Sequence, residues 1–146
     1  MAFKRKSGKT KLLHLPKASA VAITPNTVMK FNNIGGVIIA VSDTNERVVG
    51  VSRDSHATSD TTTKLIAVEV PIEKYVEWEF DTDSDGGLTD TMVGTFRDLD
   101  TLGANVDASA VADGVVLVTG RISATKGVGV LVRLMDNGFV PITAST

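Results

Sequence analysis

Short β-branched runs separated by turn residues dominate the pattern of apolar and polar positions along the chain. No long stretch places apolar residues at i, i+3, i+4 and i+7, as an amphipathic helix requires. The connecting stretches read TPN, NNIGG, SDTNE, DTDSDGG and MDNG, and their Asn, Asp and Gly residues suit hairpin turns. The pattern therefore predicts an all-β chain.

Nine segments fit the description of a strand. They are Ser19–Ile23, Thr27–Phe31, Gly36–Val41, Arg47–Ser52, Lys64–Val70, Lys74–Phe80, Met92–Leu99, Gly114–Ser123 and Gly127–Met135. Within YVEWEF, the apolar residues Val76, Trp78 and Phe80 fall at alternate positions, which predicts a strand with one buried face. We expect a small barrel or sandwich of about eight or nine short strands, preceded by an extended N-terminal arm.

Charge divides the chain into two unequal parts. Residues 1–42 contain seven Lys or Arg residues and no Asp or Glu, whereas the other 104 residues carry eight basic and seventeen acidic ones. The two parts therefore have net charges of +7 and −9, which sum to the −2 of the whole chain. Such an uneven distribution of charge gives information about binding partners more than about the fold. We expect an extended basic arm over residues 1–18, which would be mobile in isolation, and a β-rich domain over residues 19–146.

The basic arm is the strongest candidate for a binding site. The residues predicted to contact a partner are Lys4, Arg5, Lys6, Lys9, Lys11, Leu12, Leu13, Leu15 and Lys17. Three interpretations remain open, namely strand addition to an acidic protein surface, weak phosphate contacts with nucleic acid, and an idle solvated tail. The acidic body and the scarcity of aromatic residues disfavour nucleic acid, so docking on a protein is the preferred interpretation.

The stretch EWEFDTDSDGGLTD holds the one pattern that points to a metal. Asp81, Asp83 and Asp85 occupy alternate positions, and Gly86 follows where a calcium loop requires glycine. The twelfth position is Met92, however, which cannot supply the carboxylate that closes such a loop. The alternative is a solvated acidic turn between two strands, so calcium binding is a secondary hypothesis.

The amino-acid composition excludes several classes of function. There is no cysteine, which excludes disulfides and thiolate chemistry, and no apolar run approaches the length of a membrane-spanning helix. The two histidines lie outside any recognisable catalytic pattern. These observations predict a protein made in the cytoplasm that is not an enzyme, takes no small-molecule substrate and enters no membrane.

The run RVVGVSRDSHATSDTTTKLIAVEVP, followed by DLDTLGANVDAS, VLVTGRIS and GVGVLVR, resembles the decoration, or cement, proteins of tailed bacteriophages. In that family a V-x-G-V strand precedes a polar loop and an I-x-V-x-V strand. The likeness covers the segment from Val48 to Arg133. It implies a head-stabilising protein without enzymatic activity, which is made in the host cytoplasm and resides on the outer capsid surface of the virion.

The resemblance further implies binding to the major capsid protein, commonly as a homotrimer that clamps neighbouring capsomers. In the lambda-type branch the N-terminal arm is flexible when free and becomes ordered on the capsid by strand addition, and Lys4–Lys17 is the matching segment here. The basic arm could also dock on the acidic body of a neighbouring copy. The alternatives are a tail-tube, head–tail-joining or head-fibre protein, or a calcium-binding β module.

Overall fold

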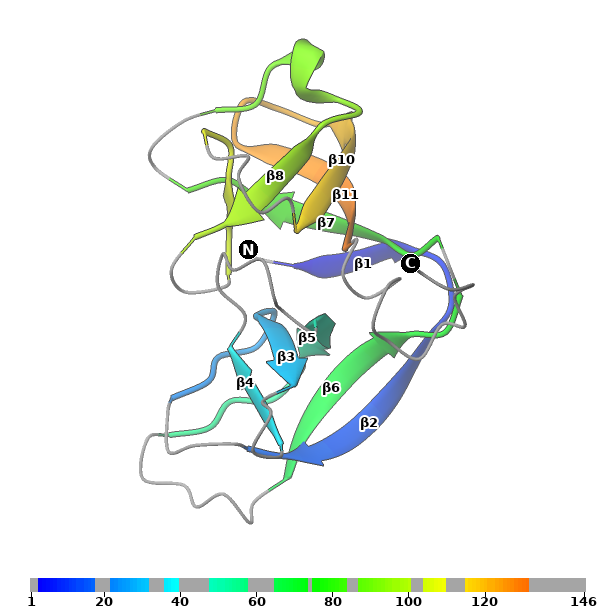
Figure 1. The fold of residues 1–146 in the computed structure, drawn as a ribbon, viewed down its shortest axis with the longest axis vertical. Helices are drawn as coiled ribbons and strands as arrows, with labels where there is room; N and C mark the ends of the chain where they lie inside the picture. Colours follow the sequence, from blue (N-terminus) through cyan, green and yellow to red (C-terminus); the bar gives the residue numbers. More distant parts are fainter. Residues whose placement is uncertain are drawn as a thin grey trace.

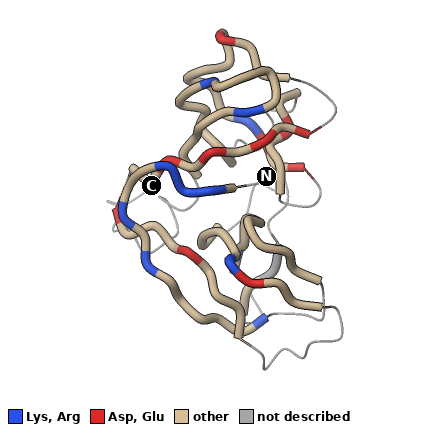
Figure 2. Tube along the Cα trace, turned by 180° about the vertical axis from the view of Figure 1, so that it is seen from behind, with Lys and Arg blue, Asp and Glu red and all other residues tan. Residues whose placement is uncertain are grey.

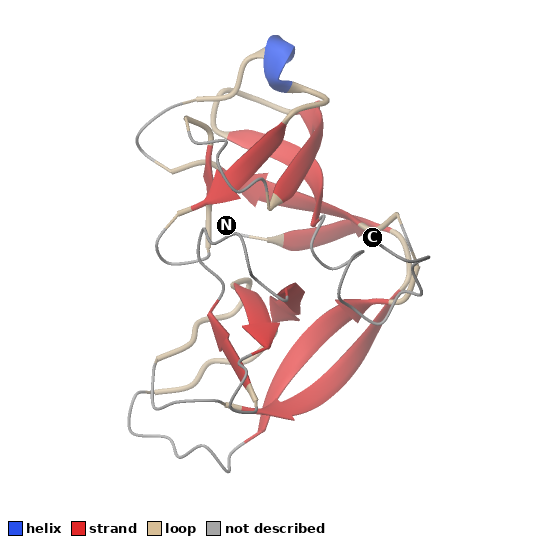
Figure 3. Cartoon of the chain, viewed as in Figure 1, coloured by secondary structure: helices blue, strands red, loops and turns tan. Residues whose placement is uncertain are grey.

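The computed structural model describes residues 3–17, 22–31, 36–39, 48–57, 65–73, 75–83, 87–100, 104–109 and 115–131. Strands dominate these residues, and the only helix among them is a single 3-10 turn, η1, at Asp90–Met92 (Figure 3). The prediction of an all-β chain is confirmed.

Eleven strands form in the described part of the chain. They are β1 (Lys4–Ser7), β2 (Thr10–Pro16), β3 (Val28–Phe31), β4 (Val37–Ile39), β5 (Val48–Ser52), β6 (Leu65–Pro71), β7 (Glu77–Asp81), β8 (Phe96–Leu99), β9 (Val106–Asp107), β10 (Val116–Arg121) and β11 (Lys126–Leu131). Eight of the nine predicted segments overlap one of them, and Ser19–Ile23 lies mostly outside the described residues. The sequence pattern did not predict β1, β2 or β9.

The strands form two antiparallel sheets. Sheet A has the strand order β1-β7-β11-β10-β8-β9, and sheet B has the order β2-β6-β5-β3-β4. In Figure 1, sheet A lies above sheet B, and the chain passes from β1 in one sheet to β2 in the other along the right-hand side. The sheets share a buried core, as in a β-sandwich, and the described strands do not close into one barrel.

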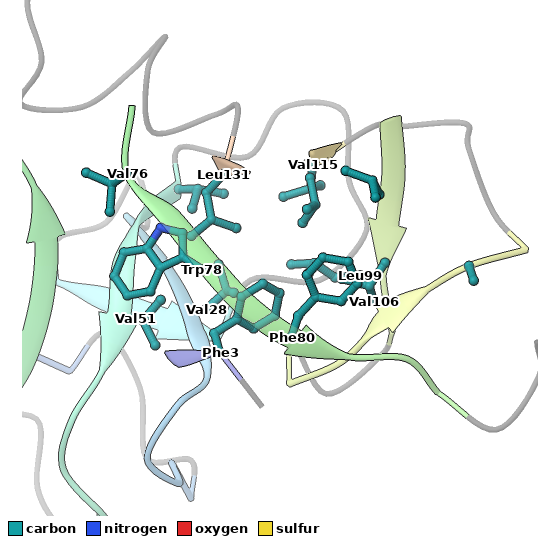
Figure 4. Close-up of a cluster of buried hydrophobic side chains, with 14 of the residues drawn as sticks. Phe3, Val28, Val51, Val76, Trp78, Phe80, Leu99, Val106, Val115 and Leu131 are labelled. Atoms are coloured by element: carbon teal, nitrogen blue, oxygen red, sulfur yellow. The ribbon is translucent and has the colours of Figure 1, made fainter. Parts of the chain in front are cut away.

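The larger core cluster joins the two sheets. Trp78 and Phe80 come from β7 of sheet A, whereas Val28 and Val51 come from sheet B, and all four are almost fully buried. Phe3, just ahead of β1, lies among them, with its ring centroid 6.1 Å from that of Phe80 (Figure 4). The predicted alternation of β7 is confirmed, because its residues alternate between half-buried and buried.

A second cluster fills the other face of sheet B. It consists of aliphatic and Met side chains from β3 to β6 together with Ile23, and Leu13 and Leu15 of β2 pack against it. In β5, Val51 contributes to the larger cluster while Val49 contributes to this one. The strand β5 is therefore buried on both faces, which explains why its sequence is apolar apart from Gly50 and the last residue, Ser52.

The predicted N-terminal arm is extended, but it belongs to both sheets. β2 pairs with β6 along its whole length, and β1 pairs with β7. The expectation of a mobile arm that is separate from the β domain is therefore wrong for Lys4–Pro16. Leu13, Leu15 and the buried Phe3 give the segment an apolar face, whose burial offsets the entropy lost on ordering. We call residues 3–17 the N-terminal segment.

Candidate interaction surface of the N-terminal segment

The structure divides the nine predicted contact residues into an exposed set and a packed set. The exposed set is Lys4, Arg5, Lys6, Lys9, Lys11 and Leu12. Leu13 and Leu15 are half-buried against the core of sheet B, and Lys17 is only 2% exposed. The Nζ of Lys17 donates a hydrogen bond to the carbonyl oxygen of Ala57 at 3.2 Å. The packed residues hold the segment in place, and the exposed ones face solvent.

A sharp bend carries the segment from sheet A to sheet B. Gly8 forms this bend with a φ of +95°, a left-handed conformation that favours glycine. A Cβ at Gly8 would lie 2.6 Å from the carbonyl oxygen of Tyr75, so the close approach also requires glycine. Beyond the bend, the N–H of Ile72 donates to the carbonyl oxygen of Lys9 at 3.0 Å. This bond extends the β2–β6 ladder by one residue toward the bend.

Glu69, on β6, ties the segment to the body through its carboxylate. The Nε of Arg5 lies 3.1 Å from Glu69 Oε2, and the hydroxyl of Thr10 donates to the same oxygen at 2.6 Å. The Nε of Arg53 donates to Oε1 at 2.7 Å. The Glu69 side chain is only 14% exposed, so these charge-assisted hydrogen bonds are strengthened by a partly desolvated environment.

Arg53 connects this carboxylate to the core between the sheets. Its guanidinium carbon lies 5.8 Å from the ring centroid of Trp78, within the range of a cation–π contact. Its Nη1 donates to the carbonyl oxygen of Phe3 at 3.2 Å and to Oδ1 of Asn26. Sequence reasoning missed both Glu69 and Arg53, because a single charged residue in or beside an apolar strand has no distinctive pattern.

The outward lysines determine the charge of the surface. Among the described residues, Lys4, Lys6 and Lys11 take part in no ion pair. Figure 2 shows Lys and Arg gathered along β1 and the start of β2, beside the acidic residues of β7. Lys4 is the register partner of Glu79 on β7. The segment thus lies as a basic band against an acidic strand of the same chain.

The acidic turn lies only partly within the described residues. Asp81 ends β7, and its Oδ1 accepts a hydrogen bond from Lys126 Nζ at 2.8 Å. The N–H of Asp83 donates to the carbonyl oxygen of Val106 at 3.0 Å, and Asp85 lies outside the described residues. Across the described ranges, no group of three or more Asp, Glu, His or Cys side chains could hold a metal ion. The ion pair disfavours the calcium hypothesis, because a metal would have to displace the ammonium group of Lys126.

Asp81 makes a small, pH-dependent contribution to stability. Burial acts to raise the pKa of Asp81, but hydrogen bonds and favourable charges, including those of Lys126, outweigh it and hold the pKa below its ordinary value of 3.8. Because the folded pKa is lowered, the stabilisation is fully present above about pH 4 and is lost as the pH falls through the folded pKa. We expect Asp81→Asn to lower the free energy of unfolding at about pH 6 and to leave it unchanged at about pH 2.

Urea denaturation of wild-type and variant protein at the two pH values measures this difference. Asp90→Asn is the matched control, because Asp90 also faces a cation, Arg121, at 3.3 Å, but its side chain is 89% exposed. We expect no measurable effect of that substitution at either pH. An equal loss of stability for Asp81→Asn at both pH values would contradict the assigned role of the ion pair. A rise in the melting temperature with added calcium would revive the metal hypothesis.

Within the ranges that the structure describes, no helix has the length and apolar character needed to cross a membrane. Comparison of the chain with protein-family models, with curated proteins and with solved structures found no match. Function must therefore be inferred from the chain's own residues, their packing and their charge.

Proposed function

We propose that this protein is a structural component of a bacteriophage virion, a decoration protein that binds the outer capsid surface and clamps neighbouring capsomers. The observation that carries this proposal is a basic pair of strands fixed along one side of both sheets, with Lys4, Lys6 and Lys11 facing solvent. The resemblance of Val48–Arg133 to decoration proteins supports the same function.

The exposed lysines favour an acidic protein as the partner. An acidic surface attracts them and accelerates the encounter, an effect that weakens as ionic strength rises. The partner in this proposal is the major capsid protein. Nucleic acid fits less well, because residues 43–146 carry a net charge of −9 and would repel phosphate.

A fixed segment would bind differently from the flexible arm of the lambda-type proteins. A flexible arm loses conformational entropy when it becomes ordered on its partner. Here the register of β2 on β6 is already set by seven consecutive residue pairs, and Phe3 is buried in the core. The segment would therefore act as a preformed docking surface, and binding would cost less ordering entropy than it does for a free arm.

We also propose that the protein acts as a homotrimer and has no enzymatic activity. Several modest contacts made at once by a trimer bind a shell far more tightly than one contact does. The same association stabilises the folded protein, because partner copies bind only the folded form.

Head binding tests the proposed function directly. We expect the purified protein to cosediment with expanded heads that were assembled without it, and to raise the temperature at which those heads release their DNA. Heads that already carry a full complement of the protein are the control, since their sites are occupied. Analytical ultracentrifugation of the free protein should show trimers. Failure to bind undecorated heads, or assembly of the protein into tubes, would contradict the decoration role.

A further inference from the structure

The N-terminal segment makes its contacts with the body of the chain and few with itself. Within the described residues, β2 pairs only with β6 and β1 only with β7. Inside the segment, Arg5 Nη1 donates a hydrogen bond to the carbonyl oxygen of Gly8 at 2.8 Å. The body therefore holds a complete receptor for this segment.

The receptor recognises the segment in three ways. The backbone edges of β6 and β7 set the register of the two ladders. The buried site beside Phe80 accepts the ring of Phe3. The carboxylate of Glu69 accepts Arg5 and Thr10. We call this combination of β6, β7, the Phe3 site and the Glu69 carboxylate the receptor strip.

We propose that the receptor strip also receives the N-terminal segment of a second copy, so that neighbouring copies are joined by exchange of residues 3–17. The inference rests on the proposed function, in which copies stand side by side on a shell, and it names the contact that joins them. Its strands pair with the body alone, so the segment can make the same contacts with its own body or with that of another copy. Exchange then keeps these contacts and changes only the body to which the segment is connected, so its free-energy cost is small. A high local concentration of copies favours exchange.

Charge favours exchange over simple pairing of the outer edges. The segment brings Lys4, Arg5 and Lys6 to β7, whose outer face carries Glu77 and Glu79. If the outer edges of two β1 strands paired instead, basic side chains would face basic side chains, which is unfavourable. A second copy therefore fits the receptor strip better than the exposed edge.

Engineered cysteines can tell exchange from pairing within one chain, because the natural chain has none. Lys4 and Glu79 are register partners, and the Cα atoms of antiparallel partners lie about 4.5–5.5 Å apart, a separation that a disulfide can span. In a mixture of full-length Lys4→Cys and Glu79→Cys proteins, a disulfide between these two positions can form only between copies. Ser7→Cys with Glu77→Cys is a second register pair that guards against a local distortion at the first.

Phe96→Cys mixed with Leu117→Cys is the matched control, because these register partners join β8 to β10 within the body. Each mixture is unfolded in urea, refolded together and mildly oxidised, and mass spectrometry without reductant then quantifies the mixed dimer. We expect roughly tenfold more mixed dimer from each segment pair than from the control pair. Equal yields from segment and control pairs would overturn the exchange.

The Lys4→Cys/Glu79→Cys double variant provides a second test. Exchange predicts covalent multimers whose share rises with protein concentration, and a purely intramolecular disulfide at every concentration would overturn it. Head binding is measured separately. Heads that bind the protein without any mixed dimer would refute the exchange and leave decoration standing, whereas mixed dimers without head binding would refute decoration alone.

Discussion

Replacing Gly50 with alanine is expected to lower the free energy of unfolding by about 3 kcal/mol or more. Gly50 lies in the middle of β5, between β3 and β6. A Cβ at this position would lie 2.1 Å from the carbonyl oxygen of Glu69 and 3.1 Å from Cγ1 of Val68. Because the nearest atom belongs to the backbone, no side-chain rotation relieves the clash, and β5 and β6 must move apart.

Gly120→Ala is the control for this prediction. Gly120 also lies in a strand, but its Cβ would lie 3.8 Å from Val128 Cβ, an ordinary van der Waals distance. We expect that variant to change the free energy of unfolding by less than about 1 kcal/mol in urea denaturation. Equal losses in the two variants would mean that the close approach of β5 to β6 is not what requires glycine at Gly50.

The same close approach matters for the interaction surface. Val51 is the register partner of Glu69, and Arg53 follows two residues later. Separation of β5 from β6 would therefore pull Arg53 away from the Glu69 carboxylate and from the carbonyl oxygen of Phe3. Gly50→Ala should consequently loosen the N-terminal segment as well as the sheet, which amide hydrogen exchange of β1 and β2 can measure.

Replacing Phe3 with alanine is expected to lower the free energy of unfolding by about 3–5 kcal/mol, the usual loss for a buried Phe. Its side chain is fully buried in the core between the two sheets, against Phe80. The same substitution would leave the free energy of unfolding almost unchanged if Phe3 belonged to a mobile arm. Urea denaturation of the variant therefore discriminates between a packed segment and a free one.

Lys4→Ala is the control for Phe3→Ala. Lys4 is the next residue along the chain and is exposed, so its truncation should change stability by less than about 0.5 kcal/mol. Similar small effects for both variants would contradict the packing of Phe3.

A further consequence concerns truncation, since removing residues 1–17 would expose the edges of β6 and β7 and destabilise the body. Neutralising the exposed lysines is therefore a better probe of binding than deleting the segment.

The local pattern of apolar and polar residues was sufficient to predict most strands, because a strand that buries one face must alternate in hydrophobicity. β7 illustrates this, since Trp78 and Phe80 are buried between half-buried acidic residues. Strand ends were harder to predict. The predicted strand Met92–Leu99 begins only at Phe96, because Met92 ends the η1 turn and Gly94 adopts a φ of +89°. That turn depends on backbone geometry that an apolar pattern does not encode.

The N-terminal segment shows the limit of local pattern. Its lysines and its lack of helical periodicity indicated an extended, basic stretch, and Lys4–Ser7 and Thr10–Pro16 are strands in the structure. Whether such a stretch is free or paired depends on an acceptor about fifty to seventy-five residues away, in β6 and β7. No local signal marks those strands as the partners of the segment, because an unpaired strand edge is a property of the assembled sheet.

The residues of the interaction surface show the same difference between what local sequence predicts and what only the fold decides. The exposed lysines of the segment were predictable, because charge is a local property of the sequence. Glu69 was not, since its importance comes from the meeting of Arg5, Thr10 and Arg53 at one carboxylate. The partner of Asp81 was not predictable either, because Lys126 is forty-five residues away along the chain.

The amino-acid sequence alone thus determined the all-β class, most strands and the separation of basic from acidic residues. These properties follow from side-chain hydrophobicity, turn chemistry and charge, which act over a few neighbouring residues. Only folding in three dimensions could decide that the basic segment completes both sheets, that Phe3 enters their shared core and that Glu69 holds the segment in place. Those outcomes depend on which distant strands meet, and their contacts exist only once the sheets have formed.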